Sequence, residues 1–126
     1  MKIAIKILDI NIICILRENL TAEKIVSILP LESNINVWGD EIYFPVESIN
    51  LELENDAKDV MELGEIAFWI QGNSIAIGYG ATPVSVRDEI RLINYANVWA
   101  DAEDPKQLLK LKNISQNTQI KISLLN

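Results

Sequence analysis

Residues 36–46, NVWGDEIYFPV, place a glycine-containing turn directly before a strand-like alternation of side chains. Glu41 and Tyr43 occupy one set of alternate positions, and the apolar side chains occupy the other, at Ile42, Phe44 and Val46. Apolar residues at every second position are typical of a strand with one buried face. The stretch therefore predicts a strand over residues 37–46 whose outer face carries an acid and a phenol.

The same two-residue period recurs on both sides of this stretch. It predicts strands in five further segments, residues 2–8, 12–16, 65–71, 74–80 and 119–125. Turn residues at 9–11 and 72–73 are expected to join neighbouring strands as hairpins. The first and last strands both carry lysines and are expected to pair with each other. Residues 89–93 and 97–99 are predicted as shorter extended pieces.

Two helices are expected from capping residues. The first begins at Thr21, a good N-cap residue, and ends before Pro30, with an apolar face between them. The second begins at Asp104, which is followed by a proline at the first helical position, and runs to about Leu111. Residues 50–59 are polar and acidic, and their pattern leaves both a short helix and a loop open.

These elements amount to six to eight short strands with one or two short helices. Many short strands separated by turns are typical of a β-sandwich or a β-barrel. Pairing of the two terminal strands would close a barrel. The length of 126 residues, without a linker-like segment, predicts a single domain over residues 1–126.

Charge and composition argue against several classes of function. The chain carries 11 basic and 18 acidic residues, and its net charge of −7 repels the phosphates of a nucleic acid. It has no histidine, which excludes Ser-His-Asp and Cys-His catalysis and zinc sites of the histidine type. General acid–base chemistry would therefore depend on carboxylates, lysine or tyrosine.

The single cysteine and the apolar segments indicate a compartment. Cys14 lies in an apolar run, cannot form an intrachain disulfide, and is expected to be a buried thiol in a reducing cytoplasm. No stretch reaches the roughly 18 apolar residues that a membrane span requires, so no membrane association is expected. The acidic residues between 52 and 59 lack the ligand order of an EF-hand loop, and we expect no metal ion and no cofactor.

Four segments share a pattern with a known family: ENLTA at residues 18–22, WGDEIYF at 38–44, GEIAFWIQGN at 64–73 and YGATPVS at 79–85. In these segments the chain resembles the small prokaryotic cyclophilin-like domain family of unknown function, where they read E-N-P-T-A, W-G-D-E-I-Y-F, G-D-I-A-Y-W-x-x-G-N and F/Y-G-x-T-P-x-S. Leu20 and Glu65 stand where that family has proline and aspartate. The resemblance implies a mainly β fold, a closed cyclophilin-like β-barrel of about eight mostly antiparallel strands with one or two short helices covering the ends.

The same resemblance invites a comparison with the cyclophilins that are prolyl isomerases. In those enzymes the comparable strand carries F-H-R, and its arginine polarises the prolyl amide. Here that strand reads Glu41-Ile42-Tyr43-Phe44, with a carboxyl and a phenol and no guanidinium. A carboxylate favours a cation or a hydroxyl donor over a carbonyl oxygen, so the fold resemblance does not by itself imply isomerase activity.

The outward faces of the strands at 41–46 and 65–71 suggest where a ligand would bind. If these strands lie near each other, their outward side chains form an aromatic floor with a few polar anchors, as small-molecule and peptide sites do. The candidate ligand-binding residues are Glu41, Tyr43, Trp69 and Gln71 on the strands, with Asn73 and Thr82 from adjoining turns.

Structural roles compete with this interpretation. Trp38 beside a glycine is typical of a packing residue at a barrel end. Asn73 is typical of a turn conformation, and Thr82 before proline is typical of a rigid loop corner. Arg87 and Arg91 are expected to be solvated charges.

Three functions remain open on the sequence. The first is a domain without enzymatic activity that binds a small molecule or a peptide. The second is a weak peptidyl-prolyl cis-trans isomerase that desolvates the prolyl amide. The third is a carboxylate-based enzyme with Glu41 as the general base. A monomer and a homodimer are both compatible with the sequence, because no self-complementary pattern identifies an interface.

Overall fold

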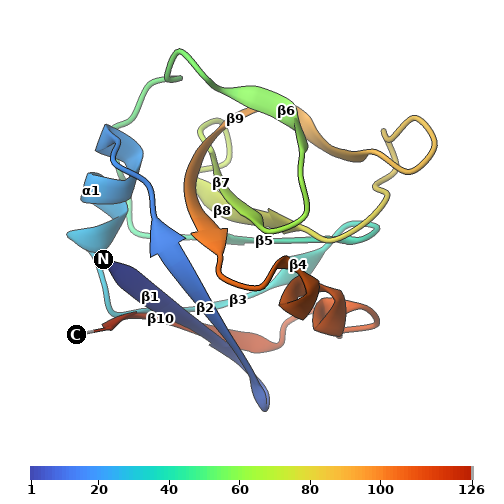
Figure 1. Ribbon diagram of the computed structural model, residues 1–126, viewed down its shortest axis with the longest axis horizontal. Coiled ribbons are helices and arrows are strands. Elements are labelled where there is room, and N and C mark those ends of the chain that lie inside the picture. Colours follow the sequence, from blue (N-terminus) through green and yellow to red (C-terminus); the bar gives the residue numbers. More distant parts are fainter. Residues whose placement is uncertain (126) are drawn as a thin grey trace.

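The computed structural model describes residues 1–125 and consists mainly of short strands (Figure 1). In chain order the elements are β1 (Lys2–Ile7), β2 (Ile10–Leu16), α1 (Leu20–Val26), β3 (Leu31–Asn34), β4 (Asn36–Val37), β5 (Glu41–Pro45), β6 (Lys58–Met61), β7 (Glu65–Trp69), β8 (Ser74–Gly78), β9 (Ile90–Ala102), the 3₁₀ helix η1 (Pro105–Leu111) and β10 (Gln119–Leu125).

Nine of these strands form one continuous antiparallel sheet within residues 1–125. Their order is β3-β10-β1-β2-β9-β7-β8-β5-β4. The two strands at the ends of this order, β3 and β4, are separated in sequence only by Ile35, so the sheet curls round into a nearly closed barrel. The prediction of a mainly β barrel is confirmed. The first and last strands pair as expected, with Lys2 opposite Leu125 and Ile7 opposite Ile120.

The barrel interior follows the two-residue period of the strands. In β1, Ile3, Ile5 and Ile7 are buried, while the lysines between and before them are exposed. Trp99 and Phe44 are the largest fully buried side chains of the same core. The alternation that defines each strand in the sequence is therefore the alternation between core and surface.

The two helical segments lie on opposite sides of the barrel (Figure 1). Helix α1 adds Ala22 and Ile25 to the main core, and η1 adds Leu108 and Leu111. The prediction that Thr21 caps α1 is wrong. Asn19 is the N-cap, because its side chain accepts a hydrogen bond from the amide of residue 22, at 2.9 Å.

Thr21 lies inside the first turn of α1 and is buried. Its hydroxyl donates to the carboxylate of Glu54 and accepts a bond from the Asn97 amide. Asn97 in turn donates to the carbonyl of Glu52 at 2.9 Å and accepts from the amide of Glu54 at 2.8 Å. These bonds hold residues 50–57 against the barrel as a loop, and residues 58–59 begin β6, so the segment is not the short helix that the sequence left open.

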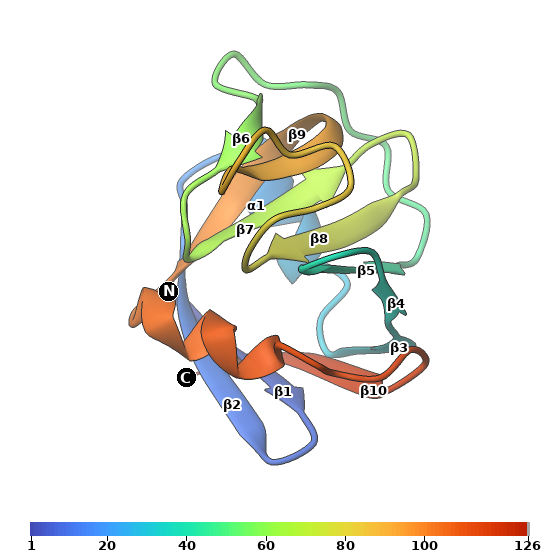
Figure 2. The same ribbon diagram turned by 90° about the vertical axis from the view of Figure 1, so that its right-hand side faces the viewer.

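Strand β9 replaces the two short extended pieces that the sequence predicts. It is a single strand that pairs with β2 and β7 in its second half and with β6 in its first half. Its first half and β6 fold back over the outer face of β7 and β8 (Figure 2). A second, smaller cluster is buried there, composed of Met61, Ala67, Ala76, Leu92, Ala96 and Val98.

Small residues on β7 and β8 allow this close approach. At Gly78, an added Cβ would lie only 2.4 Å from the side chain of Ile90. The glycine is therefore required by the contact between β8 and the start of β9. Within residues 1–125, neither helical segment is long and apolar enough to cross a membrane.

Candidate functional site

A cavity of about 240 Å³ lies on the outer face of the barrel wall, beside the second cluster. It is lined by Trp38, Glu41, Tyr43, Trp69, Ala76, Leu92 and Ile93. The lining comes from β5, β7 and β8, from the first half of β9 and from the turn before β5. The cavity therefore depends on β9 folding back over the sheet.

The turn before β5 places Trp38 and Glu41 next to each other at the cavity. The Trp38 amide donates to the Glu41 carbonyl at 2.9 Å, and the Glu41 amide donates to the Trp38 carbonyl at 3.2 Å. Gly39 closes this turn with a φ of 60°. A Cβ at Gly39 would lie 2.9 Å from the Cα of Thr82, so this turn also packs tightly on the loop after β8.

Glu41 is a buried acid without a partner. Glu41 is only 5% exposed, and its Oε1 atom is buried with no hydrogen-bond partner in the described part of the chain. Burial away from water raises the pKa of Glu41 to about 8. The carboxyl is therefore mostly protonated at neutral pH, and it is a buried polar group in the lining of the cavity.

A second buried acid, Glu65, differs from Glu41 because it has ion-pair partners. It is 6% exposed, but it accepts ion pairs from Arg17 Nη2 at 3.0 Å and from Lys58 Nζ at 2.7 Å. These cations neutralise Glu65 within the fold. Among the described residues Glu41 has no such ion pair, so the two buried acids have different roles.

Two aromatic rings form one wall of the cavity. The centroids of Tyr43 and Trp69 are 5.8 Å apart and their planes meet at 89°, an edge-to-face arrangement. The indole Nε1 of Trp69 donates to Oδ1 of Asn94 at 3.0 Å, which fixes the ring relative to β9. This bond restrains the Trp69 ring, and the face of an aromatic ring carries negative electrostatic potential.

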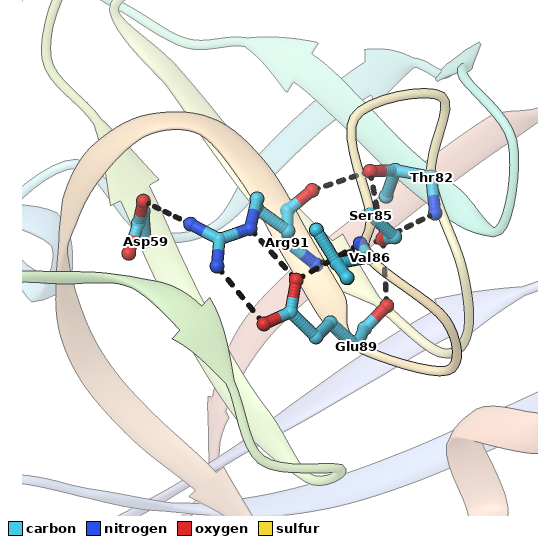
Figure 3. Close-up of polar contacts among 6 residues, drawn as sticks. All are labelled: Asp59, Thr82, Ser85, Val86, Glu89 and Arg91. Atoms are coloured by element: carbon cyan, nitrogen blue, oxygen red, sulfur yellow. Dashed lines mark hydrogen bonds and ion pairs between the residues drawn. The ribbon is translucent and has the colours of Figure 1, made fainter.

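A network of hydrogen bonds and ion pairs surrounds Arg91, next to the lining residues of β9 (Figure 3). Arg91 donates to the Glu89 carboxylate at 2.8 and 2.9 Å and to Asp59 Oδ2 on β6 at 2.7 Å. The Thr82 hydroxyl donates to the Arg91 carbonyl, and Ser85 Oγ donates to the Glu89 carbonyl at 2.6 Å. The network orders the loop that leads into the two apolar lining residues of β9. Arg91 is thus paired rather than solvated, which corrects the expectation for this residue, whereas Arg87 is exposed as expected.

The structure brings three of the six predicted site residues together. Glu41, Tyr43 and Trp69 all line the cavity. The other three, Gln71, Asn73 and Thr82, are not among its lining residues, and Gln71 is exposed beyond the end of β7.

Asn73 and Thr82 have structural contacts instead. Asn73 adopts a φ of 45° in the β7–β8 turn, and its side chain donates to the Val46 carbonyl at 2.9 Å and accepts from the Ile49 amide at 3.2 Å. Thr82 is buried in its own loop, where its amide donates to Ser85 Oγ at 2.9 Å. Both residues shape the loops that surround the cavity.

Sequence reasoning missed the apolar contributors from β8 and β9. Ala76, Leu92 and Ile93 line the cavity, and Ile93 is 51% exposed. Trp38, which the sequence favoured as a packing residue, is partly exposed and lines it as well. Among the described residues, no three His, Cys, Asp or Glu side chains gather as a metal site would require.

The protein is an antiparallel β-barrel with a helical segment on each side. Its outer wall carries a cavity that is lined by aromatic rings and a buried acid. The chain belongs to the cyclophilin-like family, whose sequence profile matches residues 1–123. It is also similar to a hypothetical protein from Archaeoglobus fulgidus with a known solution structure. The two are 30% identical, the match covers 98% of this chain and 93% of that chain, and the TM-score is 0.75. No curated protein sequence matches the chain significantly.

Proposed function

We propose that this protein is a binding domain that holds a small molecule, or one side chain of a peptide, in the cavity on the outer barrel wall. The observation that carries the proposal is the buried Glu41 carboxyl, whose Oε1 has no partner among the described residues. An unpartnered buried polar atom costs about 1–3 kcal/mol, a cost that a ligand with a suitable polar group would relieve.

The size and lining of the cavity support a small ligand. Its volume of about 240 Å³ is below the roughly 300–1,000 Å³ of sites for drug-sized molecules. Apolar and aromatic side chains with a few polar groups are the composition expected for such a site. The proposal is therefore a ligand group with fewer than about ten non-hydrogen atoms.

Nuclear magnetic resonance of the three indole N–H groups tests this proposal. Trp38 and Trp69 line the cavity, whereas Trp99 is fully buried in the main core and serves as an internal control. We expect at least one of four probes, phenol, n-butanol, N-methylacetamide or n-butylammonium, to shift the Trp38 and Trp69 signals and leave the Trp99 signal unchanged. No shift at tens of millimolar, or an equal shift of all three signals, would refute specific binding.

A pair of matched variants adds a second check. Tyr43→Ala removes one of the two aromatic rings of the wall and should weaken probe binding about two- to twelvefold, since an aromatic contact contributes roughly 0.5–1.5 kcal/mol. Tyr95→Ala is the control, because Tyr95 is 55% exposed and lies outside the lining. Equal affinities of the two variants would contradict the proposed location.

General acid–base catalysis by Glu41 is the second candidate. The observation that favours it is the pKa of about 8, because a catalytic group is most effective when its pKa is near the working pH. At neutral pH the protonated acid could also donate a hydrogen bond to a prolyl amide. An isomerisation assay on a short X-Pro peptide at high protein concentration tests this candidate. A rate increase that Glu41→Gln abolishes would support it, and a rate equal to background would remove prolyl isomerisation from consideration.

A further inference from the structure

We propose that the cavity selects a primary alkylammonium group, either a free amine or a lysine-type side chain, which pairs with Glu41 while its alkyl stem packs on the apolar wall. This inference rests on the proposed binding function and specifies the class of ligand. It follows from the chemistry of the lining and from the charge of the whole chain.

The cavity combines the two features that recognise an organic cation. Tyr43 and Trp69 line the cavity, and an aromatic ring attracts a cation that lies over its face within about 6 Å of its centre. Glu41 supplies a carboxyl that no cation of the described chain neutralises, in contrast to Glu65. A primary ammonium has three N–H donors, so it can satisfy the carboxyl and contact a ring at the same time.

The remaining lining suits an alkyl stem. Ala76, Leu92 and Ile93 are apolar and lie in the same cavity as the acid. A cavity of about 240 Å³ has the volume of roughly eight water molecules at about 30 Å³ each, which leaves room for the four carbons and one nitrogen of a butylammonium ion. A quaternary ammonium would satisfy the rings but would leave the buried carboxyl without a hydrogen bond.

The electrostatic field of the whole chain favours a cationic ligand. The chain carries a net charge of −7, which raises the local concentration of cations and opposes anions. The titratable groups near Glu41 are Tyr43 on its own strand, Asp40 in the preceding turn and Tyr79, which directly follows β8 and interacts electrostatically with Glu41. None of them is basic, and β7 and β9 contribute only Trp69, Leu92 and Ile93 to the lining. The nearby Arg91 is already paired with two carboxylates.

Binding of an ammonium is coupled to loss of a proton from Glu41. In the free protein the acid is largely protonated below its pKa of about 8. When the ammonium binds, the acid O–H bond breaks, the proton passes to the buffer, and the resulting carboxylate accepts hydrogen bonds from the cation. The amine keeps its own proton, because its pKa is about 10.4 in a lysine-type side chain.

This coupling predicts a specific pH dependence. With a pKa of about 8, roughly 1% of Glu41 is ionised at pH 6 and about half at pH 8, so the apparent affinity for the cation should rise about 50-fold between them. A neutral probe that accepts a hydrogen bond from the protonated acid should show the opposite trend above pH 8.

Isothermal titration calorimetry with n-butylammonium and its neutral counterpart n-butanol tests the inference. At pH 6, in two buffers of different ionisation enthalpy, we expect release of close to one proton per n-butylammonium bound and none for n-butanol. This measurement uses the unaltered protein, so it does not depend on the folding of a variant.

Glu41→Gln keeps the shape of the side chain and removes the charge, and it should abolish the rise in amine affinity with pH. The matched control is Glu47→Gln, which removes one charge from an exposed position outside the lining and should retain the rise. An unchanged indole signal of Trp99 verifies the fold of both variants. Loss of the rise in both would overturn the assignment of the effect to Glu41.

The outcomes separate the inference from the proposed function. If n-butanol binds in the cavity and n-butylammonium binds no tighter, or with no pH dependence, the inference is overturned and the binding function stands. If neither binds and no other probe shifts the cavity indoles, both are overturned. A further titration with N-acetyl-lysine N-methylamide identifies which kind of molecule carries the ammonium group. Tighter binding than that of n-butylammonium indicates a peptide side chain, and weaker binding indicates a free amine.

Discussion

The burial of Glu41 makes a quantitative prediction about stability and pH. The pKa of this acid rises from its ordinary value of 4.5 to about 8 in the folded protein, because burial penalises the charged form. Below about pH 4.5 the group is protonated in both the folded and unfolded states and has no effect. As the pH rises towards 8, the unfolded chain loses this proton while the folded protein keeps it, so the free energy of unfolding falls.

The size of the effect follows from the same two values. Each pH unit between about 4.5 and about 8 costs about 1.4 kcal/mol, so the total loss attributable to Glu41 is on the order of 5 kcal/mol. Small domains have free energies of unfolding of about 5–15 kcal/mol, so this single group should have a large effect on stability between about pH 4.5 and about pH 8. Above about pH 8 the loss is complete and the Glu41 contribution becomes constant.

Urea unfolding of the natural protein and of Glu41→Gln, followed by tryptophan fluorescence from pH 5 to pH 9, measures this contribution. The glutamine variant lacks the titration, and the other carboxylates cancel in the difference between the two proteins. We expect the natural protein to lose about 1.4 kcal/mol per pH unit relative to the variant up to about pH 8. A difference that stays constant across the whole range would refute the claim that Glu41 is buried and unpaired.

Three further predictions concern residues around the core and the turn. Gly39→Ala should destabilise the fold by about 1–3 kcal/mol in urea unfolding, because of its positive φ and its contact with Thr82, and unchanged stability would contradict this. Asn97→Ala should cost about 2–4 kcal/mol in the same assay, because it leaves the Glu52 carbonyl and the Glu54 amide without partners and removes one of the two hydrogen bonds of the Thr21 hydroxyl, and a loss below about 0.5 kcal/mol would show that water replaces it. Burial raises the pKa of Cys14 to about 12, so its thiol should react with Ellman's reagent only on unfolding, and rapid labelling of the folded protein would show that it is accessible.

The strands could be predicted because their side chains alternate strictly. Ile3, Ile5 and Ile7 have no competing interpretation, and the lysines on the other face define the exposed side. The second helical segment was equally clear, because Asp104 caps it as expected and accepts a bond from the Lys106 amide at 3.2 Å. Local patterns decide such elements, and local patterns are visible in a sequence.

The N-cap of α1 and the course of β9 were not predicted correctly, because both depend on long-range contacts. Thr21 and Asn19 are both good cap residues, and the choice between them is made by the partners of Thr21 on Glu54 and Asn97, far away in the chain. In β9 the exposed Asn94 and Tyr95 interrupt the alternation where the strand changes partners from β6 to β7. A one-dimensional pattern does not record such a change.

The sequence predicted the site residues that lie on β5 and β7, but not those that β9 contributes. Glu41, Tyr43 and Trp69 point outward from adjacent parts of the sheet, as their positions in the alternation indicate. Their burial depends on Leu92 and Ile93, which reach the cavity because β9 folds back over β8. Gln71 follows the end of its strand, so the same alternation no longer decided where it points.

The pairing of β1 with β10 also has a consequence for synthesis on the ribosome. The hairpin of β1 and β2 emerges before β10, yet one edge of β1 is covered only by the segment Gln119–Leu125, which leaves the exit tunnel more than a hundred residues later. Until then the nascent chain presents an isoleucine-rich strand with open backbone groups, which is a template for unwanted association. Lys2 and Lys6 flank those isoleucines on the exposed face, where their charge opposes stacking of one growing polypeptide on another.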